Sequence, residues 1–127
     1  MPRPDWVDDT ATIPDRARLW RGISSHHIKS QNDPPSLQAL VTGEVSVNIA
    51  EETTYAEVVA KGHREDHSWR LWEFTARDVR NVGCIVDRDP LPDDPSHAVV
   101  LRGDSPGKRL KESQAKRIIQ NGRWADP

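Results

Sequence analysis

Apolar and polar residues alternate strictly over residues 44–49, the clearest periodic pattern in the chain. Val45, Val47 and Ile49 lie on one side of an extended backbone there, and polar residues lie on the other. The pattern predicts a strand with one buried face. Shorter apolar runs predict four more strands, at residues 17–23, 69–74, 84–86 and 97–101.

Capping signals predict two helices between these strands. Thr54 with Glu57 forms a capping box, in which each side chain binds a backbone N–H that the first helical turn leaves free. That helix is expected to end at Gly62, because glycine suits the position after a helix. Thr75 with Asp78 caps a second, shorter helix in the same way.

A third helix is predicted near the C-terminus. Pro106 suits the first position of a helix, with Ser105 as its N-cap, and Gly122 suits the end. One side of this helix is apolar, through Leu110, Ala115, Ile118 and Ile119.

These elements predict an α+β fold with one mixed, mostly antiparallel sheet, packed helices and a C-terminal helix. A single helical turn is expected at residues 36–40, after the proline pair at 34–35. Residues 1–15 contain three prolines and four aspartates without periodicity, so an irregular N-terminal arm is expected there. Residues 16–127 are then the single domain.

The overall composition fits one small domain with a modest core. The chain has 127 residues, of which 35% are apolar and 30% are charged. It lacks an apolar run of the roughly 18 residues that a membrane span needs, and no apolar segment follows residues 1–5. The one cysteine, Cys84, excludes an internal disulfide. We therefore expect a cytoplasmic protein with no membrane partner.

Basic residues concentrate near the C-terminus, although the chain carries a net charge of −2. Between residues 108 and 123, six basic residues stand against Glu112 alone. Five of them are candidates for binding phosphate or nucleic acid: Lys108, Arg109, Lys111, Lys116 and Arg117. The alternative is a solvated helix face, which the lack of interleaved aromatic residues favours.

Metal and thiol chemistry find little support in the sequence. His63 and His67 are four residues apart, but their segment has the pattern of a loop and no Cys-x-x-Cys motif accompanies them. We expect no metal site and no bound cofactor. Cys84 lies in an apolar run, where a thiol stays protonated and unreactive.

His97 follows the proline-rich, acidic segment 87–95 at the start of a strand. An aspartate nearby would orient the imidazole for acid–base chemistry or raise its pKa. The alternative is that His97 hydrogen-bonds the loop backbone and fixes its shape, because such a loop needs donors for its carbonyl groups. The second interpretation is favoured.

Arg21 lies in the first predicted strand, between Trp20 and Gly22. A guanidinium group at such a position can bind a phosphate or a carboxylate through two parallel hydrogen bonds. An arginine that points into a protein needs a partner of some kind. The sequence leaves open whether that partner is structural or a ligand.

Tryptophan is frequent for a chain of this size, with five residues against one tyrosine and one phenylalanine. Tryptophan concentrates at protein-binding hot spots. Trp6 and Trp124 lie near the ends of the chain, where a core role is least expected, and Trp72 shares a strand with Trp69 on opposite faces. We therefore predict partner binding through Trp6, Trp72 and Trp124.

Three segments together resemble a family of small bacterial proteins of unknown function. They are residues 19–21, residues 44–50 and the motif 89–99, DPLPDDPSHAV. The resemblance covers residues 19–124 and implies a bacterial source.

A second resemblance is to ADP-ribosyltransferase-like toxins, including the RES domains. It is carried by a strand that ends in arginine, then a strand with serine and a helix rich in Ala, Glu and Val. It implies that NAD is a substrate, that Arg21 holds its pyrophosphate and that Ser46 positions the ribose. Glu57, with Glu73 as a rival, would stabilise the oxocarbenium-like centre.

The leading hypothesis is a small protein-interaction module, an accessory or regulatory component of a bacterial conflict or defence system. One alternative is an NAD-consuming enzyme that uses Arg21, Ser46, Glu57 and His97. A second alternative is a nucleic-acid-binding accessory that uses residues 108–123. The sequence leaves the question of catalysis open.

Overall fold

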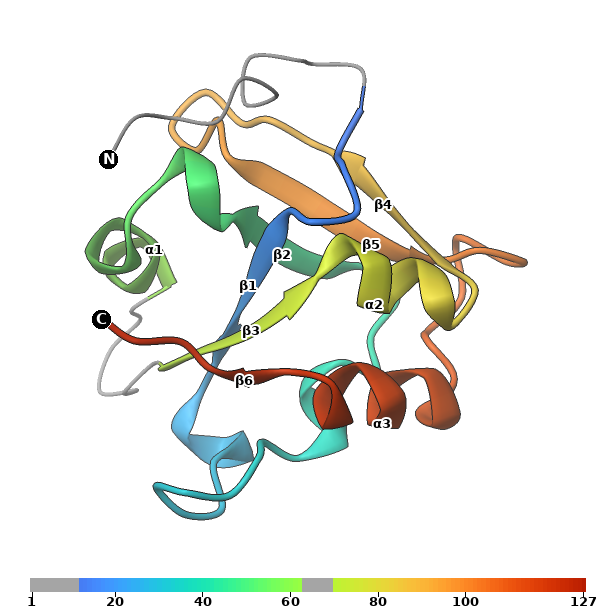
Figure 1. Cartoon of the computed structure of the whole chain (residues 1–127), viewed down its shortest axis with the longest axis horizontal. Helices are drawn as coiled ribbons and strands as arrows, with labels where there is room; N and C mark the ends of the chain where they lie inside the picture. The colour runs from blue at the N-terminus through green and yellow to red at the C-terminus, as the bar shows by residue number, and fades with distance from the viewer. Residues whose placement is uncertain (1–11, 63–69) are drawn as a thin grey trace.

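The computed structural model describes residues 12–62 and 70–127 of the chain. These residues form a six-stranded sheet with helices packed against it (Figure 1). The strands are β1 (Arg18–Ile23), β2 (Val45–Ile49), β3 (Arg70–Thr75), β4 (Cys84–Arg88), β5 (His97–Arg102) and β6 (Arg123–Trp124). The α-helices are α1 (Tyr55–Gly62), α2 (Ala76–Asn81) and α3 (Glu112–Gln120). Three 3-10 turns are η2 (Ser25–His27), η3 (Leu37–Ala39) and η4 (Ala50–Glu52).

The strand order across the sheet is β4-β5-β2-β1-β3-β6, and each neighbouring pair runs antiparallel. The sequence predicted a single α+β domain with a mostly antiparallel sheet and a C-terminal helix, and this fold class is confirmed. The register places Leu19 of β1 opposite Ile49 of β2 and Phe74 of β3. Side chains opposite each other share a face, so these three residues meet in one layer.

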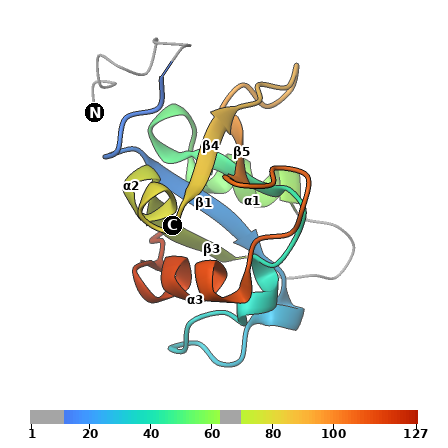
Figure 2. The same cartoon turned by 90° about the vertical axis from the view of Figure 1, so that its right-hand side faces the viewer.

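The first face of the sheet carries the main core. The alternation of β2 is as predicted: Val45, Val47 and Ile49 are buried and pack on this face, whereas Ser46 is exposed. Two helices and a 3-10 turn, α2, α3 and η3, cover the same face. In both Figure 1 and Figure 2, α3 lies beside η3, below the sheet.

The second face carries a smaller core under α1. Trp20 and Leu71 pack there against Val58 of α1 and Ala50 of η4. Figure 1 shows α1 at the left of the sheet, apart from α2 and α3 at its right. Strand β3 is therefore covered on both sides, because Leu71 faces α1 while Trp72 and Phe74 face the main core.

The predicted capping box forms completely at α2 and in part at α1. The Thr54 hydroxyl accepts a 3.2 Å hydrogen bond from the backbone N–H of Glu57 at the start of α1. The Glu57 carboxylate accepts instead from the Thr53 hydroxyl, at 3.1 Å. Thr75 and Asp78 form the complete capping box of α2. Gly83 follows α2 with φ of +83°, a conformation that residues with a Cβ rarely adopt.

The predicted start of the third helix is wrong. Helix α3 begins at Glu112, and residues 103–111 form turns and irregular chain. The backbone N–H of Leu110 donates to the carbonyl of Thr42 at 3.3 Å, and its side chain is buried in the core. This tertiary hydrogen bond draws the segment away from helical geometry, so Pro106 is not the first helical residue.

The two ends of the described chain are more ordered than the sequence indicates. Arg123 and Trp124 form β6 and pair with Glu73 and Trp72 of β3. Residues 12–14 have no regular secondary structure, and Ile13 is buried in the main core, whereas most of the predicted arm lies outside the described residues. In the part of the chain that the structure describes, no helix is long and apolar enough to cross a membrane.

Candidate functional site

Glu73 is a buried carboxylate whose two oxygens are both occupied. Its Oε1 accepts from Trp20 Nε1 at 2.9 Å and from Arg18 Nη1 at 3.4 Å. Its Oε2 accepts from Nε and Nη2 of Arg123, at 3.1 and 3.0 Å. A carboxylate this well paired is a structural anchor, because a reacting group would have to break these bonds.

Arg18 extends this cluster to a second carboxylate. Its Nε donates to Glu51 Oε2 at 2.8 Å, and its backbone N–H donates to Oε1 at 3.1 Å. The hydrogen bond to Glu51, together with the nearby charges of Glu51 and Glu73, raises the pKa of Arg18 despite partial burial. The cluster fixes β1, η4, β3 and β6 to one another.

The residues predicted for NAD chemistry lie on different faces of the sheet. Arg21 has the same parity in β1 as Leu19, so its side chain lies on the first face. Ser46 has the opposite parity to Val45 and Val47, so its side chain lies on the second. Arg21 Nη1 contacts Ser46 only at its backbone carbonyl, at 3.1 Å. The two side chains therefore do not share a pocket.

Glu57 and His97 do not complete such a site either. Glu57 is exposed on α1 and binds the Thr53 hydroxyl. His97 Nδ1 lies 2.9 Å from the carbonyl oxygen of Asp89 and 3.2 Å from its carboxylate. The imidazole thus contacts both the loop backbone and an aspartate carboxylate, so both interpretations of His97 stay predictions.

A second polar cluster braces the loop before β5. The buried carboxylate of Asp94 accepts through Oδ1 from Asn48 Nδ2 at 2.8 Å, Lys61 Nζ at 3.2 Å and Ser96 Oγ at 3.3 Å. Leu91 and Asp94 also exchange two backbone hydrogen bonds, of 3.1 and 3.0 Å. The proline-rich segment is thus a closed structural loop attached to β2 and α1.

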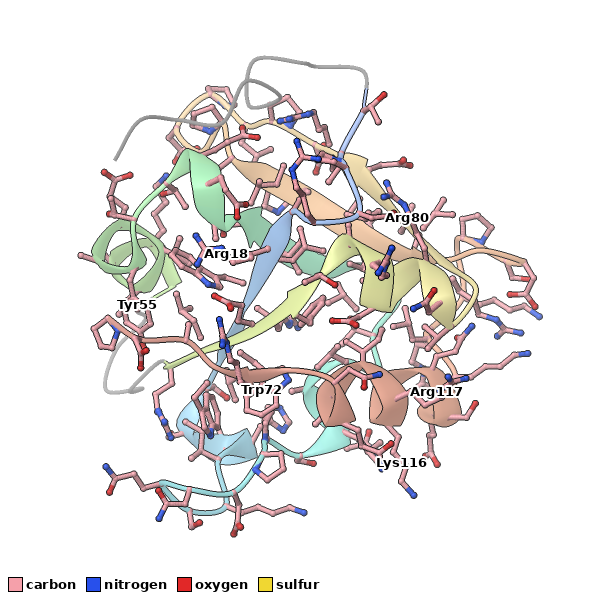
Figure 3. All side chains as sticks on the ribbon, viewed as in Figure 1. Arg18, Tyr55, Trp72, Arg80, Lys116 and Arg117 are labelled. Atoms are coloured by element: carbon pink, nitrogen blue, oxygen red, sulfur yellow. The ribbon has the colours of Figure 1, made fainter. Side chains whose placement is uncertain are left out.

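Three aromatic and cationic side chains stack near the C-terminus. Trp72 is buried and Trp124 meets it edge to face, with ring centroids 4.9 Å apart. The guanidinium carbon of Arg70 lies 3.9 Å from the Trp124 ring centroid. Figure 3 labels Trp72 to the left of α3. Because Trp72 is only 4% exposed, the prediction that its ring binds a partner is wrong.

The same stack holds the segment 29–37 in place. Trp124 Nε1 donates to the carbonyl of Asp33 at 2.9 Å, and Arg70 Nη1 donates to that of Gln31 at 3.0 Å. The backbone N–H of Ser36 donates to the carbonyl of His27 at 2.8 Å. These bonds fix an otherwise irregular segment against β3 and β6.

A groove of about 520 Å³ runs between this segment and α3. Pro34, Leu37 and Ile119 give it apolar walls, and Lys29 and Lys116 lie at its rim. The remaining lining residues are Asp33, Pro35 and Gln120. Both lysines are exposed, and neither makes an ion pair with a residue that the structure describes. With its apolar walls and basic rim, this groove is the best candidate binding site.

The predicted basic residues are all on the surface. Lys108 and Arg109 lie in the loop before α3, and Lys111 is its N-cap. Figure 3 shows Lys116 and Arg117 pointing away from α3 into solvent. Lys116 therefore belongs both to this basic surface and to the rim of the groove.

The remaining predicted sites are inert or lie outside the described residues. Cys84 is buried, and burial raises the pKa of its thiol. Residues 12–62 and 70–127 contain no group of three or more His, Cys, Asp or Glu side chains arranged for a metal. Trp6, His63 and His67 lie outside the described residues.

Comparisons of the chain with protein-family models, with curated proteins and with solved structures found no match. Both resemblances described above therefore remain expectations.

The groove between residues 29–37 and α3 was missed by the sequence analysis. The breaker Asp33-Pro34-Pro35 was its one sequence signal, and nothing in the pattern indicated that α3 would lie opposite it.

Proposed function

We propose that this protein is a protein-interaction module whose groove between residues 29–37 and α3 binds an extended segment of a partner protein. The observation that carries the proposal is a groove of about 520 Å³ with apolar walls and two exposed lysines at its rim. Concave sites with apolar walls and few polar groups are typical of ligand binding.

The partner segment is expected to combine an apolar side chain with acidic neighbours. Pro34, Leu37 and Ile119 offer apolar surface to the first, and Lys29 and Lys116 offer charge to the second. The exposed Lys111 and Arg117 extend the positive surface along α3 beyond the groove. Such complementarity mainly sets partner choice and association rate.

The groove is prepared for binding before a partner arrives. One wall is α3, which is anchored in the core by Ala115, Ile118 and Ile119. The other wall is tied to β3 and β6 by the bonds from Trp124 and Arg70. A rigid groove loses little conformational entropy on binding. Trp124 accordingly supports the wall and does not act as an anchor inserted into the partner.

A protein partner is favoured over nucleic acid. Nucleic-acid surfaces without sequence preference combine basic side chains with aromatic rings on which bases stack. Among the described residues, the large apolar side chains that are exposed are Ile85 and Leu91, and neither is aromatic. The apolar walls of the groove instead suit an apolar peptide side chain.

The proposal is tested by selecting peptides from a random display library on the intact protein. Affinities of the selected peptides are then measured by fluorescence polarisation for the wild type, Lys116→Glu and Lys108→Glu. Lys108 is the matched control, because it is exposed and lies outside the groove lining. We expect acidic, apolar peptides whose affinity falls about tenfold or more in Lys116→Glu and about twofold or less in Lys108→Glu.

Two outcomes would contradict this assignment. In one, Lys116→Glu and Lys108→Glu weaken peptide binding equally. The loss of affinity would then come from the overall charge of the protein and not from a contact in the groove. In the other, the library yields no peptide that competes for the groove, while a 20-nucleotide single strand binds and its affinity falls in both variants. A steep loss of that binding with salt would then identify a nucleic-acid surface.

A further inference from the structure

Arg21 is a partly buried cation that lacks a counter-charge in the described part of the chain. Its Nε donates to the carbonyl of Ala39 at 3.2 Å and its Nη1 to that of Ser46 at 3.1 Å. No carboxylate among the described residues forms an ion pair with it, and burial lowers the pKa of the guanidinium. Buried charges are ordinarily paired, because leaving water is costly for an ion. Arg21 therefore differs from Arg18, whose charge two carboxylates neutralise.

Arg21 lines a hollow of about 200 Å³ on the first face of the sheet. The other lining residues are Gly22, Ser24, His27, Gln38, Ala39 and Thr42, and no acidic residue is among them. The side chains of Ser24, His27 and Gln38 make no hydrogen bond within the described structure. The hollow thus gathers one positive charge and several free polar groups.

Two carbonyl acceptors fix the orientation of the Arg21 side chain. The two carbonyl acceptors, one on η3 and one on β2, use Nε and one N–H of Nη1. A guanidinium group has five N–H donors in a planar arrangement, so the second N–H of Nη1 and both of Nη2 remain. Those donors form the end of the guanidinium that binds a carboxylate through two parallel bonds.

The walls of the hollow are also fixed. The turn η2 is closed by a 3.0 Å hydrogen bond from the backbone N–H of His27 to the carbonyl of Ser24. The hydroxyl of Thr42 donates to the carbonyl of Glu44 at 2.9 Å. Ala39 is buried in the main core, which anchors η3. A ligand would therefore meet preorganised donors.

We propose that this hollow binds a carboxylate group, either of a small free acid or of the C-terminus of a peptide chain. One uncompensated positive charge matches one carboxylate, whereas a doubly charged phosphate would exceed it. The amide of Gln38 and the hydroxyl of Ser24 supply additional donors at the same hollow. This site goes beyond the proposed function, since the groove is lined by Leu37 and α3 and shares none of these residues.

The test is an NMR titration of the full chain with acetate, N-acetylglycine, acetamide and inorganic phosphate at constant ionic strength. Acetamide is the neutral isostere of acetate, and N-acetylglycine represents a chain end. We expect saturable shifts of the Arg21 Nε–H signal with acetate or N-acetylglycine, and none with acetamide. Tighter binding of N-acetylglycine would identify the ligand as the C-terminus of a peptide chain. Tighter binding of acetate would identify it as a small free acid.

Gln38→Glu is the decisive variant, because it places a negative charge at the hollow without removing the bonds of Arg21. Gln120→Glu is its control, since residue 120 is exposed, lies on α3 and is outside the hollow. We expect Gln38→Glu to weaken carboxylate binding about tenfold and Gln120→Glu to change it less than about twofold. Equal effects of the two variants, equal binding of acetamide, tighter binding of phosphate, or no saturable shift would each overturn the proposal.

Discussion

Arg123 donates two hydrogen bonds, from Nε at 3.1 Å and from Nη2 at 3.0 Å, to one carboxylate oxygen of the buried Glu73. The other oxygen of Glu73 binds Trp20, which belongs to the core under α1. Glu73 therefore connects the C-terminal strand to the second face of the sheet. Its burial is tolerated because each oxygen has a donor.

Replacement of Glu73 by glutamine should destabilise the fold. The amide keeps one acceptor but brings its own N–H donors to face those of Arg18 and Arg123. We expect the free energy of unfolding to fall by about 1–3 kcal/mol, measured by urea denaturation. Glu44→Gln is the control, because Glu44 is exposed, and it should change stability by less than about 0.5 kcal/mol. Equal effects would show that the Glu73 cluster is not stabilising.

Trp124→Ala should loosen the groove wall as well as lower stability. It removes the edge-to-face contact with Trp72, the ring under Arg70 and the hydrogen bond to the carbonyl of Asp33. We expect a loss of about 2 kcal/mol in the free energy of unfolding. Hydrogen exchange of the amides in residues 31–36 should accelerate. Trp124→Phe keeps a ring but not the N–H, so about half that loss is expected.

Gly122→Ala should be destabilising because two groups occupy the space of a Cβ. At that position a methyl group would lie 2.7 Å from the carbonyl oxygen of Glu73 and would overlap Nε1 of Trp72. Overpacking of this kind costs about 1–3 kcal/mol. Gly107→Ala is the matched control, since nothing lies within 4 Å of its Cβ position. Thermal unfolding of the two variants distinguishes them, and similar midpoints would contradict the packing.

Cys84 should make stability depend on alkaline pH. Burial raises the thiol pKa in the folded protein above its ordinary value of 9.0, so above pH 9.0 the unfolded chain releases the proton first. The free energy of unfolding should therefore fall as pH rises through this window. Urea denaturation of wild type and Cys84→Ala under reducing conditions, at pH 7.5 and 9.5, measures the effect. The wild type should lose more stability than the variant, and parallel losses would contradict a buried, protonated thiol.

Local patterns predicted most of the fold. The alternation of Val45, Val47 and Ile49 and the capping box of Thr75 are properties of neighbouring residues, so the sequence records them directly. The start of α3 was missed because the hydrogen bond from Leu110 to Thr42 joins residues 68 positions apart (110 minus 42). No local pattern contains such a bond.

The candidate sites were less predictable than the fold. The sequence indicated that Arg21 needs a partner but left open whether that partner is structural or a ligand, and the structure shows the hollow beside it. Trp124 was expected to meet a partner, since it lies near a chain end. Pairing of β6 with β3 places it against Trp72 and Asp33 and leaves it half-buried, so its contact with a partner stays a prediction. Burial of a terminal residue depends on which strand edge it reaches.

The sequence by itself determined the class of fold, the buried face of β2 and the complete cap of α2, because each follows from residues within a few positions of one another. Only the tertiary structure decided that the segment 29–37 lies opposite α3 and that, within residues 12–62 and 70–127, Arg21 has no carboxylate partner. A groove and an unpaired charge are defined by residues distant in the chain. Their arrangement is fixed by packing and long-range hydrogen bonds, which one-dimensional patterns do not encode.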